Sequence, residues 1–289
     1  MFNSISIGIN PILLDVGLIA LSWHGFFTFV AVVVSVYLVS RWGKGEGISA
    51  DDVYSVTVWA IVGGIIGARF VHVVDRWDYY GANLSNIGSV WAGGISIYGA
   101  IIGGFLGGAG YIWINHRFFK KLANVSVGKL ADISAPALLL AQAIGRIGDI
   151  VNGEHIASVT SLPWGFIYTH SSSLSNRHHG LVPSHPAVLY EMIYDLFVLV
   201  VIWRLRGRLL PSGMLFAVYG MLYAVGRFFL QFLRLDKQWI VGLQEAHIIS
   251  IIVIALTVGI LASRVRFVSK SELAVQDTLT SKRKSKSNS

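Results

Sequence analysis

The sequence of 289 residues contains no cysteine, and only 13% of its residues are charged. The missing cysteine excludes disulfide bonds, thiolate metal ligands and a thiol nucleophile, so any sulfur chemistry must come from a substrate. With 54% hydrophobic residues and a mean hydropathy of +0.63, the chain has too little polar surface for a water-soluble domain of this size. It is therefore predicted to lie in a membrane.

Apolar residues form long separate runs and do not alternate every second residue, which favours spanning helices over a barrel. A hydrocarbon core about 30 Å thick takes about 20 helical residues to cross. The predicted fold class is all-α, a polytopic membrane protein with seven transmembrane helices. The runs are Ser22–Ser40, Tyr54–Val74, Ser89–Ile114, Leu130–Val151, Ala187–Trp203, Ser212–Phe232 and Ala246–Ala262.

Basic residues are unevenly divided between the two sides of these predicted spans. Sixteen follow odd-numbered spans, the C-terminal tail included, and four follow even-numbered spans. The positive-inside rule therefore predicts the N-terminus outside and the C-terminus in the cytoplasm. Topology and anionic lipid contact explain the net charge of +8 better than nucleic acid does. We expect a multi-pass membrane protein with no nucleic-acid partner.

Two regions are predicted along the chain: a membrane domain over residues 1–266 and a disordered basic cytoplasmic tail over residues 267–289. The tail is rich in serine and lysine and has few apolar residues to offset the entropy of ordering it. No cleaved signal peptide is expected, because no basic cluster precedes the first apolar run. The loop from Asn152 to Ser184 is predicted to lie outside, as a candidate cap.

Glycines in the second and third predicted spans recur every four residues, at Gly63 and Gly67 and at Gly99, Gly103 and Gly107. This spacing predicts close approach of two helix backbones. It could also leave room for an acyl chain.

Three arginines lie inside predicted spans, namely Arg69, Arg146 and Arg227. A guanidinium at membrane depth costs at least about 2.5 kcal/mol, so each arginine needs a partner or a task. Each lies in the outward part of its predicted span, where His24 and Glu191 also lie. Tyr98 would be about 15 Å along the third predicted span, at 1.5 Å per helical residue.

Two interpretations of these arginines are open. They could pair with Asp149, Glu154 or Glu191 and only hold the helices together. For Arg69, this structural interpretation and a functional one fit equally well. For Arg146 and Arg227 phosphate binding is favoured, because a planar guanidinium binds phosphate with two hydrogen bonds.

A ten-residue segment, Gly145 to Glu154, has the sequence GRIGDIVNGE. It closely resembles the signature of the bacterial prolipoprotein diacylglyceryl transferases, a family of seven-span enzymes. Four further segments resemble the family and occur in its order along the chain: Gly67–Arg69, Gly93–Gly99, His185–Glu191 and Tyr223–Arg234. The set is specific, although each piece alone is weak.

The resemblance implies that the diacylglyceryl group of phosphatidylglycerol is transferred to the lipobox cysteine of a prolipoprotein signal peptide, with release of glycerol phosphate. No metal and no organic cofactor is implied. The substrate would supply the thiol that this chain lacks. The arginines would supply fixed positive charge to the departing phosphate.

Carried over onto this sequence, Arg146 matches the family's essential phosphatidylglycerol-binding arginine and Arg227 matches its second essential arginine. The predicted catalytic residues are Arg146, Arg227, His24, Tyr98 and Glu154. The predicted substrate-binding residues are Arg146, Asp149, Asn152, Gly153, Arg227 and Gln231.

The chain departs from the family at several of these positions. Asp149 stands where asparagine is usual, and Gln231 stands where glutamate often follows the arginine by four residues. His24 and Tyr98 stand where well-known members have tyrosine and histidine, respectively. These departures leave the identity of the base open, with His24 favoured because an imidazole accepts a thiol proton best near neutral pH.

Two rival functions remain at this point. One is a lipid or small-anion transporter with arginines along its path, although no convincing internal repeat is present. The other is a homologue that binds lipid without catalysis. A metal site in the outer loop is disfavoured, because the adjacent His178 and His179 have poor chelate spacing.

Overall fold

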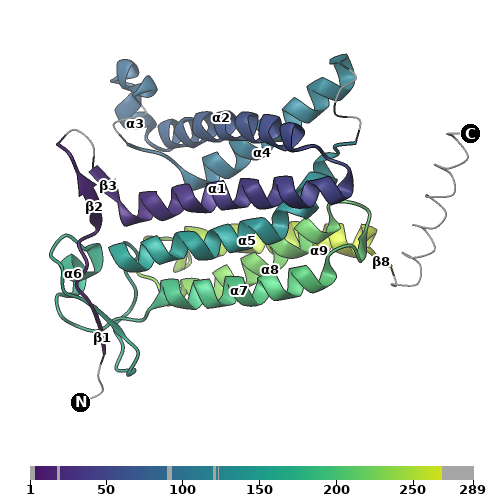
Figure 1. Ribbon diagram of the computed structural model, residues 1–289. Coiled ribbons are helices and arrows are strands. Elements are labelled where there is room, and N and C mark those ends of the chain that lie inside the picture. Colours follow the sequence, from purple (N-terminus) through teal and green to yellow (C-terminus); the bar gives the residue numbers. More distant parts are fainter. Residues whose placement is uncertain (1–3, 18–19, 90–92, 120–121, 123, 269–289) are drawn as a thin grey trace, which may run out of the picture. The chain divides into compact units, whose positions relative to one another are not determined.

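The computed structural model describes residues 4–17, 20–89, 93–119, 122 and 124–268, and Figure 1 shows their secondary structure. The chain divides into two compact units, one of Met1–Ser35 with Ala131–Ser289 and the other of Val36–Leu130. We call them unit 1 and unit 2. The predicted tail lies outside the described residues from 269 onward.

The described part is mostly helical, and six of its helices are long and apolar enough to cross a membrane. The principal helices are α1 (Trp23–Gly43), α2 (Ala50–Asp75), α3 (Trp77–Tyr80), α4 (Ile97–Ile114), α5 (Val127–Asn152), α6 (Leu174–His179), α7 (Ala187–Leu205), α8 (Met214–Gln231) and α9 (Glu245–Arg264). The fifth predicted span corresponds to α7, which is not among the six. It carries Glu191, Asp195 and Arg204 within 19 residues.

The third predicted span begins later than expected. Helix α4 starts at Ile97 and not at Ser89, with Ser96 as the N-cap that accepts a hydrogen bond from the backbone N–H of Gly99. Gly93 and Gly94 precede it with φ of 83° and 78°, a backbone conformation that cannot continue a right-handed helix. Tyr98 therefore lies in the first turn of α4, and its predicted position about 15 Å along a span was wrong.

Unit 1 contains the helices that position the candidate site. Helix α7 packs against α8, and α8 packs against α9, as Figure 1 shows. Their apolar core is built from side chains of α5, α7 and α8 and the turn between the last two: Ala135, Leu139, Val198, Ile202, Leu209, Met214 and Leu215. The carboxylate of Asp132 on α5 accepts hydrogen bonds from the backbone N–H groups of Gly213 and Phe216 at the start of α8. This carboxylate caps α8 from a neighbouring helix.

Short strands, which the all-α prediction did not include, organise the connections of unit 1. Strand β1 (Ile5–Ile7) pairs in parallel with β4 (Phe166–Tyr168). This pairing ties the N-terminal segment to the loop that follows α5. The other small sheets pair β2 (Ile12–Asp15) with β3 (Ala20–Ser22), β5 (Leu209–Leu210) with β8 (Arg266–Phe267), and β6 (Gln238–Ile240) with β7 (Leu243–Gln244).

In unit 2, helices α2 and α4 approach each other through glycines, as the four-residue spacing predicted. A Cβ added at Gly103 would overlap the carbonyl oxygen of Gly63 and would lie 2.9 Å from the Cα of Gly67. No side chain can occupy such a contact. The interface therefore supports the packing interpretation of these glycines.

We predict that Gly103→Ala destabilises unit 2 by about 1–3 kcal/mol, because the added methyl must push the two backbones apart. The measurement is the thermal unfolding midpoint in detergent, with the yield of folded protein. Gly110→Ala on the same helix is the matched control, since a Cβ there meets nothing within 4 Å. Equal stability of the two variants would contradict the packing assignment.

Candidate active site

Glu191 is the centre of a buried cluster of charged side chains in unit 1. Its side chain is 5% exposed and contacts the guanidinium groups of three arginines. Arg146 Nη2 lies 2.6 Å from Oε2, while Arg227 Nη1 and Arg234 Nη1 both contact Oε1, Arg234 at 3.3 Å. Helices α5, α7 and α8, and the turn after α8, are thereby joined through one carboxylate.

The local sequence of α8 explains how two of these arginines reach the same partner. Arg227, Gln231 and Arg234 are spaced four and three residues apart, which places them on one face of a helix and its continuation. Helix α7 comes close to this face because Gly226 has no side chain. A Cβ there would overlap the ring of Tyr194, whose hydroxyl donates to the backbone oxygen of Leu222 on α8.

Asp149 is the second buried carboxylate, and three side chains contact it. His24 Nδ1 lies 2.5 Å from Oδ1, while Arg146 Nη1 lies 3.0 Å and His155 Nε2 lies 3.3 Å from Oδ2. Arg146 therefore bridges Asp149 and Glu191 with its two terminal nitrogens. His155 continues the network, because its Nδ1 lies 2.6 Å from Nη2 of Arg234.

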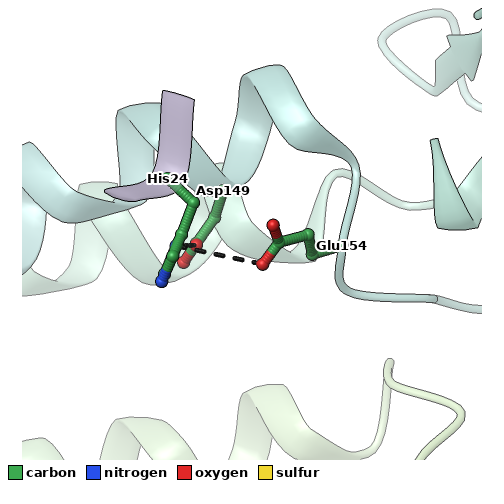
Figure 2. A group of neighbouring side chains, drawn as sticks. All are labelled: His24, Asp149 and Glu154. Carbon is green, nitrogen blue, oxygen red and sulfur yellow. Dashed lines mark hydrogen bonds and ion pairs between the residues drawn. The ribbon is translucent and has the colours of Figure 1, made fainter. Parts of the chain in front are cut away.

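Glu154 lies beside His24, as Figure 2 shows, with 3.9 Å between Oε2 and the Nδ1 of His24. Its other oxygen accepts a hydrogen bond of 2.5 Å from the amide of Asn152. Gly153, between them, has a φ of 61°, and a Cβ there would overlap Ser173 and Tyr168. The turn at the end of α5 thus requires glycine and directs Glu154 toward His24.

Gln231 stabilises the arginines from the end of α8. Its amide nitrogen contacts Gln244 and donates to Asp236 at 2.7 Å, and Asp236 also accepts from Arg234 Nε at 3.1 Å. Burial alone would raise the pKa of Asp236, but the Arg234 guanidinium and the Gln231 amide lower it below its ordinary value. This carboxylate is therefore charged near neutral pH and holds Arg234 in place.

A small pocket of about 10 Å³ opens beside the cluster, a volume that suits about one water molecule. The residues lining it are Arg146, Glu191, Tyr194, Asp195, Tyr223, Gly226, Arg227 and Leu230. A phosphate group is larger than this space. An anionic ligand must therefore displace side chains from the two arginines before it contacts both.

His24, Asp149 and Glu154 also have ligand atoms within 4.8 Å of one another, the spacing of a possible cation site. Both oxygens of Asp149 already contact donors, however, and one of those donors is the guanidinium of Arg146. A cation would have to displace these contacts beside a fixed positive charge. The hydrogen bonds account for the grouping by themselves.

Two of the predicted residues lie in unit 2, and one of them, Arg69, has a local explanation. Its guanidinium donates to four backbone carbonyl oxygens, those of Asn86, Ile87, Gly93 and Gly94, at 2.6–2.9 Å. It also stacks over the ring of Tyr80. Arg69 thus holds together residues 86–87 and 93–94 ahead of α4, whose first turn contains Tyr98.

A profile of the family described as prolipoprotein diacylglyceryl transferase matches residues 11–263. The chain belongs to this family. It is 33% identical over 246 residues to the phosphatidylglycerol–prolipoprotein diacylglyceryl transferase of Acaryochloris marina, covering 84% of this chain and 86% of that protein. The enzyme of the same name from Clostridioides difficile is 35% identical over 234 residues, covering 81% and 87%. That from Limosilactobacillus reuteri is 34% identical over 255 residues, covering 86% and 89%.

The family assignment confirms the resemblance, and the structure adds members to the predicted site. Arg146, Arg227, His24, Glu154, Asp149, Asn152 and Gln231 all belong to the unit 1 network. Arg234 and His155 were not predicted. Arg234 lies beyond the sixth predicted span, although its spacing from Arg227 was a usable signal. His155 had no signal that distinguishes it from other loop histidines.

We expect Arg69→Ala to lower the free energy of unfolding by at least about 2 kcal/mol, since four backbone carbonyl groups lose a charged donor. The readouts are folded yield, thermal midpoint and transfer activity per folded molecule. Arg76→Ala is the control, because this arginine ends the same helix with 70% of its side chain exposed. A variant at Arg69 that folds normally and yet has no activity would reverse the structural assignment.

Proposed function

We propose that unit 1 binds the phosphate of phosphatidylglycerol through Arg146 and Arg227, while the diacylglyceryl group passes to the lipobox cysteine of a prolipoprotein. The chain is a transferase of the first step of lipoprotein maturation. The observation that carries the site assignment is the convergence of both arginines on one buried carboxylate. Guanidinium groups arranged around a carboxylate are also suited to bind another anion, such as a phosphate.

The bond that breaks follows from the products. When the thiol sulfur acquires the diacylglyceryl carbon and glycerol phosphate is released, the carbon–oxygen bond to the phosphate breaks, and its electron pair stays on the phosphate oxygen. Fixed guanidinium groups stabilise the negative charge that develops there. Arg146 and Arg227 have this role.

The remaining predicted residues position the binding groups or take part in the proton transfer. Asn152 and Gly153 shape the turn that positions Glu154, and Gln231 supports Arg234 through Asp236. His24 accepts the thiol proton, with Glu154 as its neighbour. Tyr98 lies in unit 2, and its part in the reaction stays a prediction of the resemblance.

The membrane arrangement that goes with this function has seven spans, in which α7 joins the six long apolar helices. Its carboxylates at Glu191 and Asp195 are buried, at 3% and 2% exposure, so they need not face lipid. The basic-residue bias places the N-terminus outside and the C-terminus in the cytoplasm of a bacterial cell membrane. The donor lipid and the translocated precursor then meet at the outer leaflet.

Arg146→Lys should reduce transfer at least about 100-fold, because a single ammonium cannot bridge Asp149 and Glu191 and also engage a phosphate with two donors. Arg146→Ala should abolish transfer, and Arg227→Ala should be similarly severe. The assay measures diacylglyceryl transfer from phosphatidylglycerol to a lipobox peptide by purified, folded protein. Arg264→Lys, at the exposed end of α9, is the control and should retain the parent rate. Transfer by Arg146→Lys near the parent rate would exclude the two-pronged contact.

The topology is tested with reporters. A reporter fused after Ser289 should be active on the cytoplasmic side, and one inserted after the exposed Leu181 should be active on the outer side, as the basic-residue bias requires. Both reporters on the same side, or the reverse pattern, would remove the basis for placing the site at the outer leaflet.

A further inference from the structure

Asp149 has a set of contacts that fits a role other than lipid binding. Its side chain is 5% exposed, and its two oxygens contact His24, Arg146 and His155. An ionised carboxylate with these partners accepts hydrogen bonds only. It would repel the phosphate of an anionic lipid. The contacts with two histidines instead point to control of their protonation.

The contact with Arg234 determines the tautomer of His155. A guanidinium can only donate hydrogen bonds, so the Nδ1 of His155, 2.6 Å from Arg234 Nη2, must be the acceptor. The proton of His155 is then on Nε2, which faces Asp149. Both ring nitrogens of His155 therefore already have hydrogen-bond partners, Arg234 and Asp149.

His24 is held in the opposite tautomer. Its Nδ1 lies 2.5 Å from Oδ1 of Asp149, so this nitrogen carries the proton and the lone pair is left on Nε2. The side chain is 44% exposed. Of the two histidines, only His24 presents an acceptor nitrogen on an exposed ring.

Gly148 allows the two residues to meet. A Cβ at this position on α5 would lie 2.8 Å from the Cα of His24 and 2.9 Å from the carbonyl oxygen of Trp23. The start of α1 therefore packs directly on the backbone of α5. Any side chain at position 148 would push His24 away from Asp149.

We infer that Asp149 is a positioning residue that holds His24 in the Nδ1–H tautomer, with Nε2 ready to accept the proton of the acceptor cysteine. This inference rests on the proposed function. In the step itself the S–H proton moves to Nε2, sulfur bonds to the diacylglyceryl carbon, and glycerol phosphate leaves with the carbon–oxygen electron pair. The charge of Asp149 stabilises the imidazolium that forms.

The test compares Asp149→Asn, His24→Gln and the double variant with the parent protein. In Asp149→Asn the amide can hydrogen-bond the wrong tautomer of His24 and carries no charge, and in His24→Gln the base is absent. In both variants kcat at neutral pH should therefore fall at least about 100-fold, a typical contribution of a general base. The KM for phosphatidylglycerol should stay within about threefold. The kcat of the double variant should be no lower than that of the less active single variant, because both substitutions disable the same proton acceptor.

Raising the pH supplies a readout that a purely structural role would not change. The acceptor thiol has an ordinary pKa of about 8.5, so above pH 9.5 it ionises without a base and the defects of both variants should largely disappear. Other charged groups near His24 are Arg146 and Glu154, and they are unaltered in these variants. A defect of equal size at every pH, a raised KM with unchanged kcat, or parent-like activity of Asp149→Asn would each overturn the inference.

Because Asp149 also pairs with Arg146, a second variant separates positioning from folding. Gly148→Ala keeps Asp149 and its contact with Arg146 but displaces His24, and it should show the same loss of kcat with recovery at alkaline pH. Gly145→Ala on the same helix, where a Cβ meets nothing within 4 Å, should match the parent. If the parent itself transfers no diacylglyceryl group, the proposed function fails; if the parent transfers and these variants equal it, only the role of Asp149 fails.

Discussion

The shared carboxylate of Glu191 is the interaction on which the site depends. Three guanidinium groups in a buried place repel one another and lose their hydration, a cost that they tolerate only around a compensating anion. Glu191 supplies that anion from α7 to Arg146 on α5, Arg227 on α8 and Arg234 beyond it. Without it, Arg227 would lose this ion pair, while Arg146 and Arg234 would retain Asp149 and Asp236 as partners.

The same arrangement explains how an anionic lipid could be recognised. The guanidinium groups are already oriented toward a common carboxylate, that of Glu191. The pocket beside them is smaller than a phosphate, which means that the lipid phosphate must compete with Glu191 for its arginines. Arg146 also contacts Asp149 and so couples the phosphate-binding cluster to the histidine pair.

Much of the helical framework could be predicted from hydropathy alone, because spanning helices must be long and apolar. The start of α4 could not, since the segment around Gly93 and Gly94 is as apolar as a helix and only its positive φ angles break the run. The strand pairing of the N-terminal segment with β4 was also beyond prediction. It depends on contacts between residues more than 150 positions apart.

The residues of the site could be predicted from the sequence better than their contacts. Arginines inside apolar runs stand out in any sequence, and both Asp149 and Glu191 were candidate partners. Which carboxylate pairs with which arginine depends on helix phase and on packing at Gly226 and Gly148. The contact of Arg234 with His155 depends on how the segments that follow α5 and α8 meet, which no local pattern specifies.

The most direct measurement uses the purified parent protein with phosphatidylglycerol labelled in its headgroup glycerol and a lipobox peptide. The account predicts release of water-soluble glycerol phosphate in one-to-one proportion with peptide that has gained a diacylglyceryl group, and no reaction when the peptide cysteine is serine. Lipid that binds without any release would indicate a non-catalytic homologue, and release without peptide modification would indicate hydrolysis. Either result would contradict diacylglyceryl transfer by the arginine cluster.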